Sequence, residues 1–97
     1  MSRPALLSEQ ALQHHSDLLP DWTVDAKSIH RDFILADFVS AIGFINAIAI
    51  HAEKMDHHPE ISLYGWNKVK VTLSTHDQGG LTELDFLLAA NINAIGI

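Results

Sequence analysis

The order of its predicted elements places this chain in the α+β class, as a two-layer sandwich with helices on one face of a four-stranded antiparallel sheet. Three observations predict this fold. Apolar residues recur at helical spacing in three segments and alternate in four short ones. These segments follow in the order α-β-β-α-β-β-α, with no internal repeat and no linker. We therefore expect a single domain over residues 1–97, in which residues 1–7 form a loose arm.

The first third of the chain predicts one short helix and two strands. Ser8 is a suitable N-cap, and apolar residues recur after it at helical spacing until Pro20 stops the helix. Residues 22–24 then predict a short strand. Residues 28–35 predict a second strand, because their apolar side chains alternate toward one face.

Asp37 is the expected N-cap of a long helix that runs from Phe38 to about Met55. One apolar stripe on it comprises Phe38, Ile42, Ile45, Ala49 and Ala52. Further apolar side chains cover much of the remaining surface: Val39, Phe44, Ile48 and Ile50. A helix that is apolar on more than one face is buried on more than one face. We expect the second face to meet another subunit; the alternative is a fully enclosed helix, for which the chain has few neighbouring elements.

The second half of the chain predicts a hairpin. Pro59 ends the long helix, because it disfavours helical backbone at His58. Residues 60–63 are expected to form a third strand and residues 64–67 a turn. Residues 68–75 predict a half-buried fourth strand, in which apolar and polar side chains alternate.

After a loop at residues 77–80, the last helix is expected to begin at Thr82. Asp85 follows three residues later, at the position of the acidic member of a capping box. Leu81 and Phe86 are placed for the accompanying hydrophobic staple. The stripe expected to face the core comprises Leu84, Leu87, Leu88 and Ile95.

Composition excludes several functional classes. The formal net charge of -6 argues against direct nucleic-acid binding, which requires a basic face. The absence of cysteine excludes disulfides, a thiolate nucleophile and a cysteine-based zinc site. The N-terminus lacks the apolar run of a signal peptide, and no apolar stretch is expected to span a bilayer. We therefore expect a cytoplasmic protein with no membrane partner.

The densest group of chemically active residues lies between residues 53 and 85. It contains the adjacent pair His57-His58 and a third imidazole at His76. Imidazole gives or takes a proton near neutral pH without special tuning. Glu53 precedes His57 by one helical turn, so its carboxylate is expected to approach and orient that ring.

Three interpretations of this group compete. The first is proton-transfer catalysis on a planar heterocycle, with Trp66 or Tyr64 as a flat wall. The second is a three-histidine metal site, which is disfavoured because adjacent histidines diverge and no H-x-H or H-x-x-x-H spacing is present. The third is structural, with His57 as a cation at a helix C-terminus and His76 at a strand end.

These residues resemble the pterin-4a-carbinolamine dehydratase family. The family pattern is an acidic residue, three positions, His-His-Pro, an aromatic residue, Thr-His and, past a glycine, an aspartate. In this chain the pattern is occupied by Glu53, His57-His58-Pro59, Trp66, Thr75-His76, Gly80 and Asp85. The resemblance extends from about residue 8 to the C-terminus.

The resemblance implies a hydro-lyase that needs no metal and no organic cofactor. Its substrate would be a 4a-hydroxytetrahydropterin, and its products the quinonoid dihydropterin and water, in tetrahydrobiopterin recycling. His57 and His76 would protonate the departing hydroxyl of the two stereoisomers, and His58 would hold the pterin and accept the proton of the ring nitrogen. The expected substrate-binding or orienting residues are Glu53, Pro59, Trp66, Thr75 and Asp85, of which Asp85 is expected to be mainly structural.

The resemblance also implies partners. We expect a homodimer or homotetramer, in agreement with the apolar second face of the long helix. Some members of the family serve as dimerisation cofactors of a transcription factor, so a protein–protein binding module without required catalysis is the alternative function. The complete histidine pattern favours the enzyme.

Overall fold

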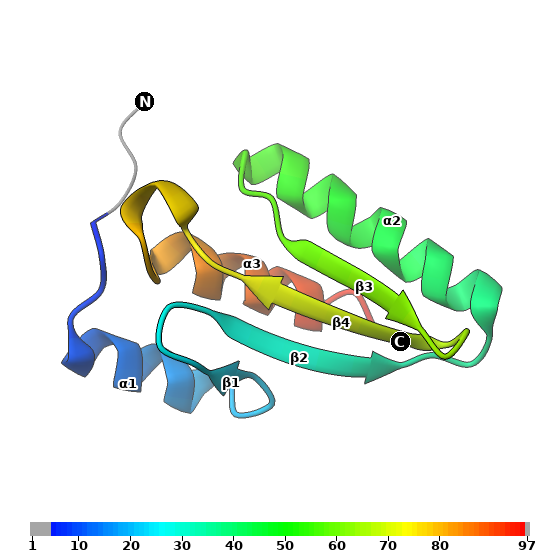
Figure 1. Ribbon diagram of the computed structural model, residues 1–97, viewed down its shortest axis with the longest axis horizontal. Helices are drawn as coiled ribbons and strands as arrows, with labels where there is room; N and C mark the ends of the chain where they lie inside the picture. Colours follow the sequence, from blue (N-terminus) through cyan, green and yellow to red (C-terminus); the bar gives the residue numbers. More distant parts are fainter. Residues whose placement is uncertain (1–4, 97) are drawn as a thin grey trace.

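The computed structural model describes residues 5–96 and confirms the predicted α+β fold (Figure 1). The elements are α1 (Glu9–Leu18), β1 (Thr23–Val24), β2 (Ile29–Ile34), α2 (Phe38–Met55), β3 (Glu60–Tyr64), β4 (Lys68–Leu73), the 3-10 turn η1 (His76–Gln78) and α3 (Glu83–Asn93). The order of helices and strands is the predicted one. The bounds of all four strands differ from the expected ones by one or two residues; β4, for example, ends at Leu73 rather than Thr75. The loop after β4 contains the turn η1.

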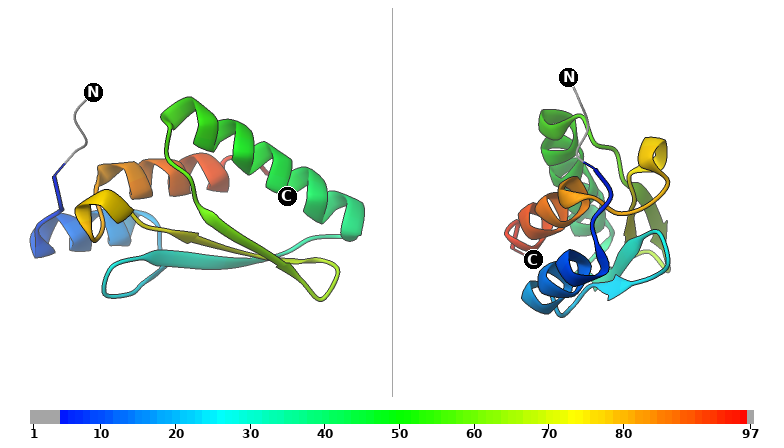
Figure 2. Two further views of the ribbon diagram at one scale, coloured as in Figure 1. Left: turned by 45° about the horizontal axis from the view of Figure 1, so that its top comes forward. Right: turned by 90° about the vertical axis from the view of Figure 1, so that its left-hand side faces the viewer.

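The four strands form one antiparallel sheet in the order β1-β2-β4-β3. The helices α1, α2 and α3 lie side by side on one face of this sheet, as the edge-on view in Figure 2 shows. In β2 and β4 alternate side chains point toward the helices, so Ile29 pairs with Leu73 and Phe33 with Val69 in the core. Among the α-helices of residues 5–96, none covers the other face of the sheet (Figure 2).

The N-caps expected from the sequence are confirmed. Ser8 accepts a hydrogen bond from the Ala11 N–H at 3.1 Å, and Asp37 accepts one from the Ser40 N–H at 2.7 Å. Residues 1–4 of the expected arm at residues 1–7 lie outside the described residues. Leu7 does not belong to a loose arm, because its N–H donates to the Leu81 carbonyl at 3.0 Å and its side chain packs against the core.

The buried face of α2 is not the expected stripe. The residues that face the core are Ala41, Phe44, Ile48 and Ala52, whereas Phe38, Ile42 and Ala49 are exposed. The predicted core-facing side of α2 was therefore wrong, because the helix is rotated about its axis relative to the prediction. Only Ala52 belongs to both the predicted stripe and the buried face. Because α2 is apolar around most of its circumference, its periodicity does not distinguish which side meets the sheet.

By length and composition alone, α2 is long and apolar enough to cross a membrane, with 18 residues and a mean hydropathy of 1.2. The expectation that no stretch would meet this criterion was therefore wrong. In the folded chain, however, α2 packs against β4 and α3 and contributes Phe44 and Ile48 to the core. Only 22% of the helix is buried in this way.

The N-terminus of α3 carries the predicted capping box. The Thr82 hydroxyl accepts from the backbone of the first turn, and the Asp85 carboxylate accepts from the Thr82 N–H at 2.9 Å. The expected core stripe was wrong at Leu87, which is 55% exposed. The buried residues of α3 are Asp85, Phe86, Leu88, Ala89 and Ile92.

Candidate active site

The end of α2 separates the two adjacent histidines. Asp56 takes up a left-handed backbone conformation, with φ 50°, and its N–H and that of His57 close the helix onto Ala52 and Glu53 carbonyls. This C-terminal turn reverses the chain. As a result His57 points inward and is 5% exposed, while His58 remains exposed.

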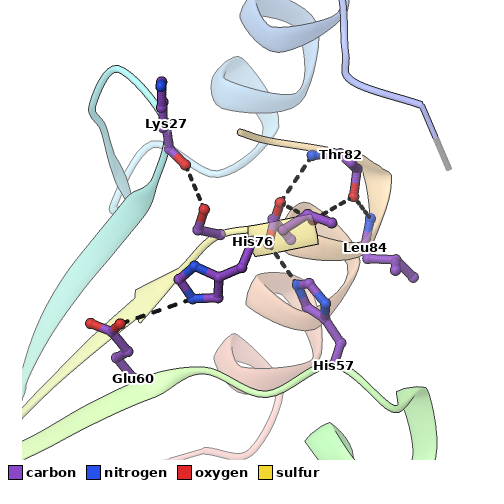
Figure 3. A network of polar contacts seen from close by, with 9 residues as sticks. Lys27, His57, Glu60, His76, Thr82 and Leu84 are labelled. Atoms are coloured by element: carbon purple, nitrogen blue, oxygen red, sulfur yellow. Dashed lines mark hydrogen bonds and ion pairs between the residues drawn. The ribbon is translucent and has the colours of Figure 1, made fainter. Parts of the chain in front are cut away.

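A buried hydrogen-bond network receives the His57 ring (Figure 3). His57 Nε2 lies 2.6 Å from Asp85 Oδ1, and Asp85 Oδ2 accepts from Thr75 Oγ1 at 2.8 Å and from the Thr82 N–H. The hydroxyls of Thr75 and Thr82 lie 2.8 Å apart. Both carboxylate oxygens of Asp85 are therefore engaged, although the side chain is fully buried.

This network selects the tautomer of His57. An ionised carboxylate only accepts hydrogen bonds, so the short contact with Asp85 requires the proton of His57 to be on Nε2. Nδ1 is then the ring nitrogen that remains for a ligand. The capping box of α3 thus also orients a candidate catalytic imidazole, which had not been expected.

The helical spacing suggests that Glu53 contacts His57, but the Glu53 carboxylate bonds to His58 instead. Its Oε1 lies 2.8 Å from Nε2 of His58, and both side chains are exposed. The correction has a clear cause, because the left-handed residue Asp56 ends the helix before His57 can occupy the next helical position. His58 therefore has an orienting carboxylate of its own.

His76 approaches from the other chain segment. Thr75 pairs with Gly80 in an isolated bridge, and Gly79 takes the left-handed conformation, with φ 73°, that ends η1 and closes this loop. His76 opens the turn and is largely exposed. Its Nε2 lies 3.9 Å from Oε1 of Glu60, the first residue of β3 (Figure 3).

The three histidines line one hollow of about 310 Å³. Its walls are formed by Asp56, His57, His58, Ser74, His76 and Asp77. The Ser74 hydroxyl donates to the Lys27 carbonyl at 2.8 Å, which ties the β1–β2 turn to this part of the molecule. Four residues at the hollow were not predicted from the sequence: Asp56, Glu60, Ser74 and Asp77. Their only local signal is that each lies within three residues of a site histidine.

Trp66 does not belong to this hollow. It lies in the turn between β3 and β4, with φ 59° and 62% of its surface exposed. The hollow is at the opposite end of that hairpin, and the five residues of β3 separate the two ends by roughly 17 Å. Pro59 directly precedes β3 and is half-buried.

Two other hollows among the described residues lack such a group of histidines and acidic side chains. The space between α1 and α3, about 450 Å³, is mainly apolar, and the His15 ring there stacks on Phe86 with centroids 5.1 Å apart. Within residues 5–96, no three His, Asp or Glu side chains are grouped so that they could hold a metal ion.

Comparisons with known proteins agree with one another. A family model described as pterin 4 alpha carbinolamine dehydratase matches residues 5–95. Curated relatives carry pterin-4-alpha-carbinolamine dehydratase as a provisional name. The relative from Chloroflexus aggregans is 46% identical over 94% of this chain and 97% of its own length. The relative from Nostoc punctiforme is 42% identical over 93% of this chain and 96% of its own length.

Solved structures are similar as well. A crystal structure described as a transcriptional coactivator/pterin dehydratase from Brucella melitensis has a TM-score of 0.85 and 42% identity, and the match covers 93% of this chain and 97% of that one. A pterin dehydratase-like protein described as a RuBisCO assembly factor in the alpha-carboxysome has a TM-score of 0.61. At 23% identity, with 75% of this chain and 83% of that chain covered, this second likeness concerns the fold alone.

Proposed function

Because the chain belongs to the pterin 4 alpha carbinolamine dehydratase family, we propose that it removes water from a 4a-hydroxytetrahydropterin, in the cytoplasm, in the recycling of tetrahydrobiopterin or a related pterin. One observation supports this above all. Three imidazoles from two chain segments line one hollow, and each faces a carboxylate. Such groups suit a reaction in which one proton is given and another is taken.

The proposed reaction breaks the bond between C4a and its hydroxyl oxygen. An acid in the site gives a proton to that oxygen, which leaves as water. A base takes the proton of the adjacent ring nitrogen, and its electron pair forms the double bond from that nitrogen to C4a. One proton enters and one leaves, so the site returns to its starting charge after proton exchange with water.

We assign the base to His58. Its Nε2 lies 2.8 Å from Oε1 of Glu53, and a carboxylate in that position orients the ring. The exposure of this pair leaves the ring accessible to substrate. Glu53 is thus proposed as the positioning residue of His58, in place of the role toward His57 that its spacing suggested.

We assign the acids to His57 and His76. The C4a hydroxyl stands on one or the other face of the pterin, and these two imidazoles come from different chain segments, so each would serve one stereoisomer. His57 would act through Nδ1, since Nε2 is bonded to Asp85. Thr75 and Thr82 would support it by holding the Asp85 carboxylate.

The test is a dehydration assay with freshly generated 4a-hydroxytetrahydropterin. We expect the protein to accelerate release of the quinonoid product, and His58→Ala to lower turnover by about 10²-fold or more. His14→Ala is the matched control, because that imidazole is exposed on α1, outside the hollow. An inactive wild-type protein, or equal losses in both variants, would refute the assignment.

A second candidate function is a protein-binding module. Helix α2 exposes Phe38, Val39, Ile42 and Ile50, and apolar patches of this kind mark interaction surfaces. The Brucella melitensis protein is described as both a coactivator and a dehydratase, so the two roles are compatible. A partner that is captured equally by wild-type protein and by the His58→Ala variant would support this function.

The same surface supports a homo-oligomer. Two copies that covered their exposed α2 residues with each other would remove apolar surface from water without using the hollow. We propose a dimer or tetramer on this basis.

A further inference from the structure

The turn that joins β3 to β4 contains a strained tryptophan. The Asn67 N–H donates to the Gly65 carbonyl at 2.7 Å, so Gly65, Trp66 and Asn67 form a γ-turn with Trp66 at its centre. Trp66 has φ 59°, in the left-handed region that bulky side chains rarely adopt. A γ-turn with a positive φ at its centre is rare and strained, and glycine adopts such a φ without steric cost. The tryptophan at this position therefore lowers the stability of the turn.

The surrounding structure holds the turn in this conformation. Asn67 is buried, its carbonyl accepts from the Leu35 N–H at 2.8 Å, and its side-chain amide donates to the Leu35 carbonyl at 3.0 Å. The Trp66 side chain itself is mostly exposed. Within residues 5–96 it makes no hydrogen bond and no contact with another aromatic ring. A strained residue whose side chain does not support the fold indicates a role outside the fold.

Trp66 lies next to a group of side chains on the open face of the sheet. The strand register places Ile34, Lys68 and Tyr64 in one row across β2, β4 and β3, at the end of the sheet that adjoins the turn. Lys70 follows on the same face, because alternate residues of β4 point toward the helices. Figure 1 shows this end of the β3–β4 hairpin opposite to η1 and the end of α2, where the histidine hollow lies. The hairpin-tip surface is defined by Ile34, Tyr64, Trp66, Lys68 and Lys70.

Three members of the hairpin-tip surface are large apolar or aromatic side chains that are exposed to solvent: Ile34, Tyr64 and Trp66. The Tyr64 hydroxyl donates to Asp32 Oδ1 at 3.0 Å, and this bond fixes the direction of the ring across the sheet. Tryptophan and tyrosine are enriched among the residues that contribute most to binding at protein interfaces, and they lose little conformational entropy on binding. An exposed group of this kind is typical of a protein interaction site.

The charges of the surface indicate the kind of partner that fits it. Lys68 and Lys70 are two of the six lysine and arginine residues in a chain of net charge -6. Within residues 5–96 neither of them forms an ion pair with a carboxylate. Carboxylates of a partner would therefore meet two ammonium groups beside the aromatic rings. A polynucleotide fits less well, because Asp32 lies opposite Lys70 and the chain as a whole is acidic.

We propose that the hairpin-tip surface is a docking site for an acidic segment of a partner protein, in which apolar side chains stand next to aspartate or glutamate. Trp66, Tyr64 and Ile34 contact the apolar side chains of that segment, and Lys68 and Lys70 bind its carboxylates. The strained turn keeps the Trp66 ring exposed at the tip of the hairpin. This site is separate from the histidine hollow, so it is a function in addition to the dehydration proposed above.

Two substitutions of Trp66 separate binding from folding. Trp66→Gly removes the ring and relieves the strained φ, so its melting temperature should equal or exceed that of the wild type. Trp66→Phe keeps an aromatic ring in the same turn. A melting temperature of Trp66→Gly clearly below that of the wild type would show that the tryptophan serves the fold, and would overturn the inference from strain.

The binding experiment selects random peptides displayed on phage against the wild-type protein. Dissociation constants of the enriched peptides are then measured at low salt and at about 1 M salt, where charge interactions are screened within about 3 Å. The variants are Trp66→Gly, Trp66→Phe and Lys70→Glu. One control is Leu87→Ala, which removes an exposed apolar side chain on α3, and the other is Lys54→Glu, which makes the same change of charge on α2.

We expect the enriched peptides to combine apolar residues with aspartate or glutamate. They should bind the wild type at least about tenfold more tightly than Trp66→Gly, and Trp66→Phe should retain part of the affinity. Lys70→Glu should weaken binding by roughly fivefold at low salt and much less at high salt. Leu87→Ala and Lys54→Glu should bind as the wild type does.

Failure to enrich any peptide whose binding depends on Trp66 would overturn the docking site. Enriched peptides rich in lysine or arginine, or equal binding by Lys70→Glu and the wild type, would overturn the acidic partner. Oligothymidylate bound as tightly as the peptides would show a nucleic-acid site instead. Loss of self-assembly in Trp66→Gly, measured by sedimentation, would show that a second copy of the chain covers the surface and would also overturn the proposal.

Discussion

At the scale of single residues, Asp85 connects stability and chemistry. The sequence predicted a capping residue, and the capping box is present. The same carboxylate also receives the His57 ring at 2.6 Å and the Thr75 hydroxyl at 2.8 Å. A fully buried carboxylate needs several donors to offset its lost hydration, and here one of these donors is a candidate catalytic group.

We expect Asp85→Asn to lower both stability and turnover. The amide oxygen can still accept from Thr82, but its NH₂ group would face His57 and move the ring proton to Nδ1. Turnover of the stereoisomer that depends on His57 should fall at least about tenfold. Stereoisomer-resolved kinetics and ¹⁵N chemical shifts of the His57 ring measure the two effects. Unchanged turnover with an unchanged tautomer would show that Asp85 is only structural.

The roles of the other imidazoles are separable by stereochemistry. His57→Ala and His76→Ala should each impair mainly one C4a stereoisomer, because the two rings belong to different segments around the hollow. His58→Ala should impair both. The assay uses each stereoisomer separately with all three variants. Equal losses toward both isomers in His57→Ala and His76→Ala would contradict the two-acid scheme.

At the scale of elements, α2 is a helix whose core-facing side is decided by its neighbours. Ile48 is fully buried, whereas Ile50, two residues later, is 59% exposed. Both residues are apolar and equally suited to a core by their chemistry. Their different surroundings make them a matched pair for testing which face of α2 supports the fold.

Ile48→Ala should lower the free energy of unfolding by about 2–5 kcal/mol, because it leaves a cavity in the core. Ile50→Ala should change it by no more than about 0.5 kcal/mol in the monomer. Urea unfolding at low and high protein concentration measures both variants and separates folding from assembly. Equal losses in the two variants at low concentration would contradict the observed orientation of α2.

The capping carboxylate at the N-terminus of α2 predicts that the stability of the fold depends on pH. Hydrogen bonds from Ser40 hold the pKa of the Asp37 carboxyl below its ordinary value. A lowered pKa means that the carboxylate stabilises the fold above its unfolded-state pKa, and that this contribution is lost as the pH falls through the lower folded-state pKa. Asp37→Asn should remove this part of the acid destabilisation and leave turnover unchanged. Melting temperatures of both proteins from pH 2 to pH 7 provide the comparison, and parallel curves would contradict it.

At the scale of the whole molecule, the two sides of the helical layer differ. One side packs on the sheet, and the outer side of α2 presents Phe38, Val39 and Ile50 to solvent, each more than half exposed. The hollow with the histidines lies at the end of α2, where β3 begins. Assembly through α2 and access of substrate to the hollow are therefore compatible.

We expect sedimentation analysis to show a dimer or tetramer at micromolar concentration. Val39→Glu, at a position that is 78% exposed, should shift the protein toward monomer, because burying a carboxylate in an apolar interface is costly. Glu9→Gln on α1 serves as a surface control. A wild-type protein that is monomeric throughout the concentration range would refute this assembly.

Local patterns in the sequence determined the class of the fold, the order of its elements, the three N-caps and the histidines of the site. These features depend on residues that are a few positions apart, so a helix cap or the alternation of a strand can be recognised in the local sequence. The capping box of Thr82 and Asp85 is an example, because its partners are three residues apart.

Only the tertiary structure decided which carboxylate meets which histidine, which face of α2 is buried, and that Trp66 lies away from the hollow. Asp85 and His57 are 28 residues apart, so their contact depends on how α3 packs beside the end of α2. Glu53 is near His57 in sequence, yet it bonds to His58, because the left-handed residue Asp56 ends the helix between them. The physical reason is the same in each case: packing and chain reversal set the contacts between segments, and no periodicity within a segment contains that information.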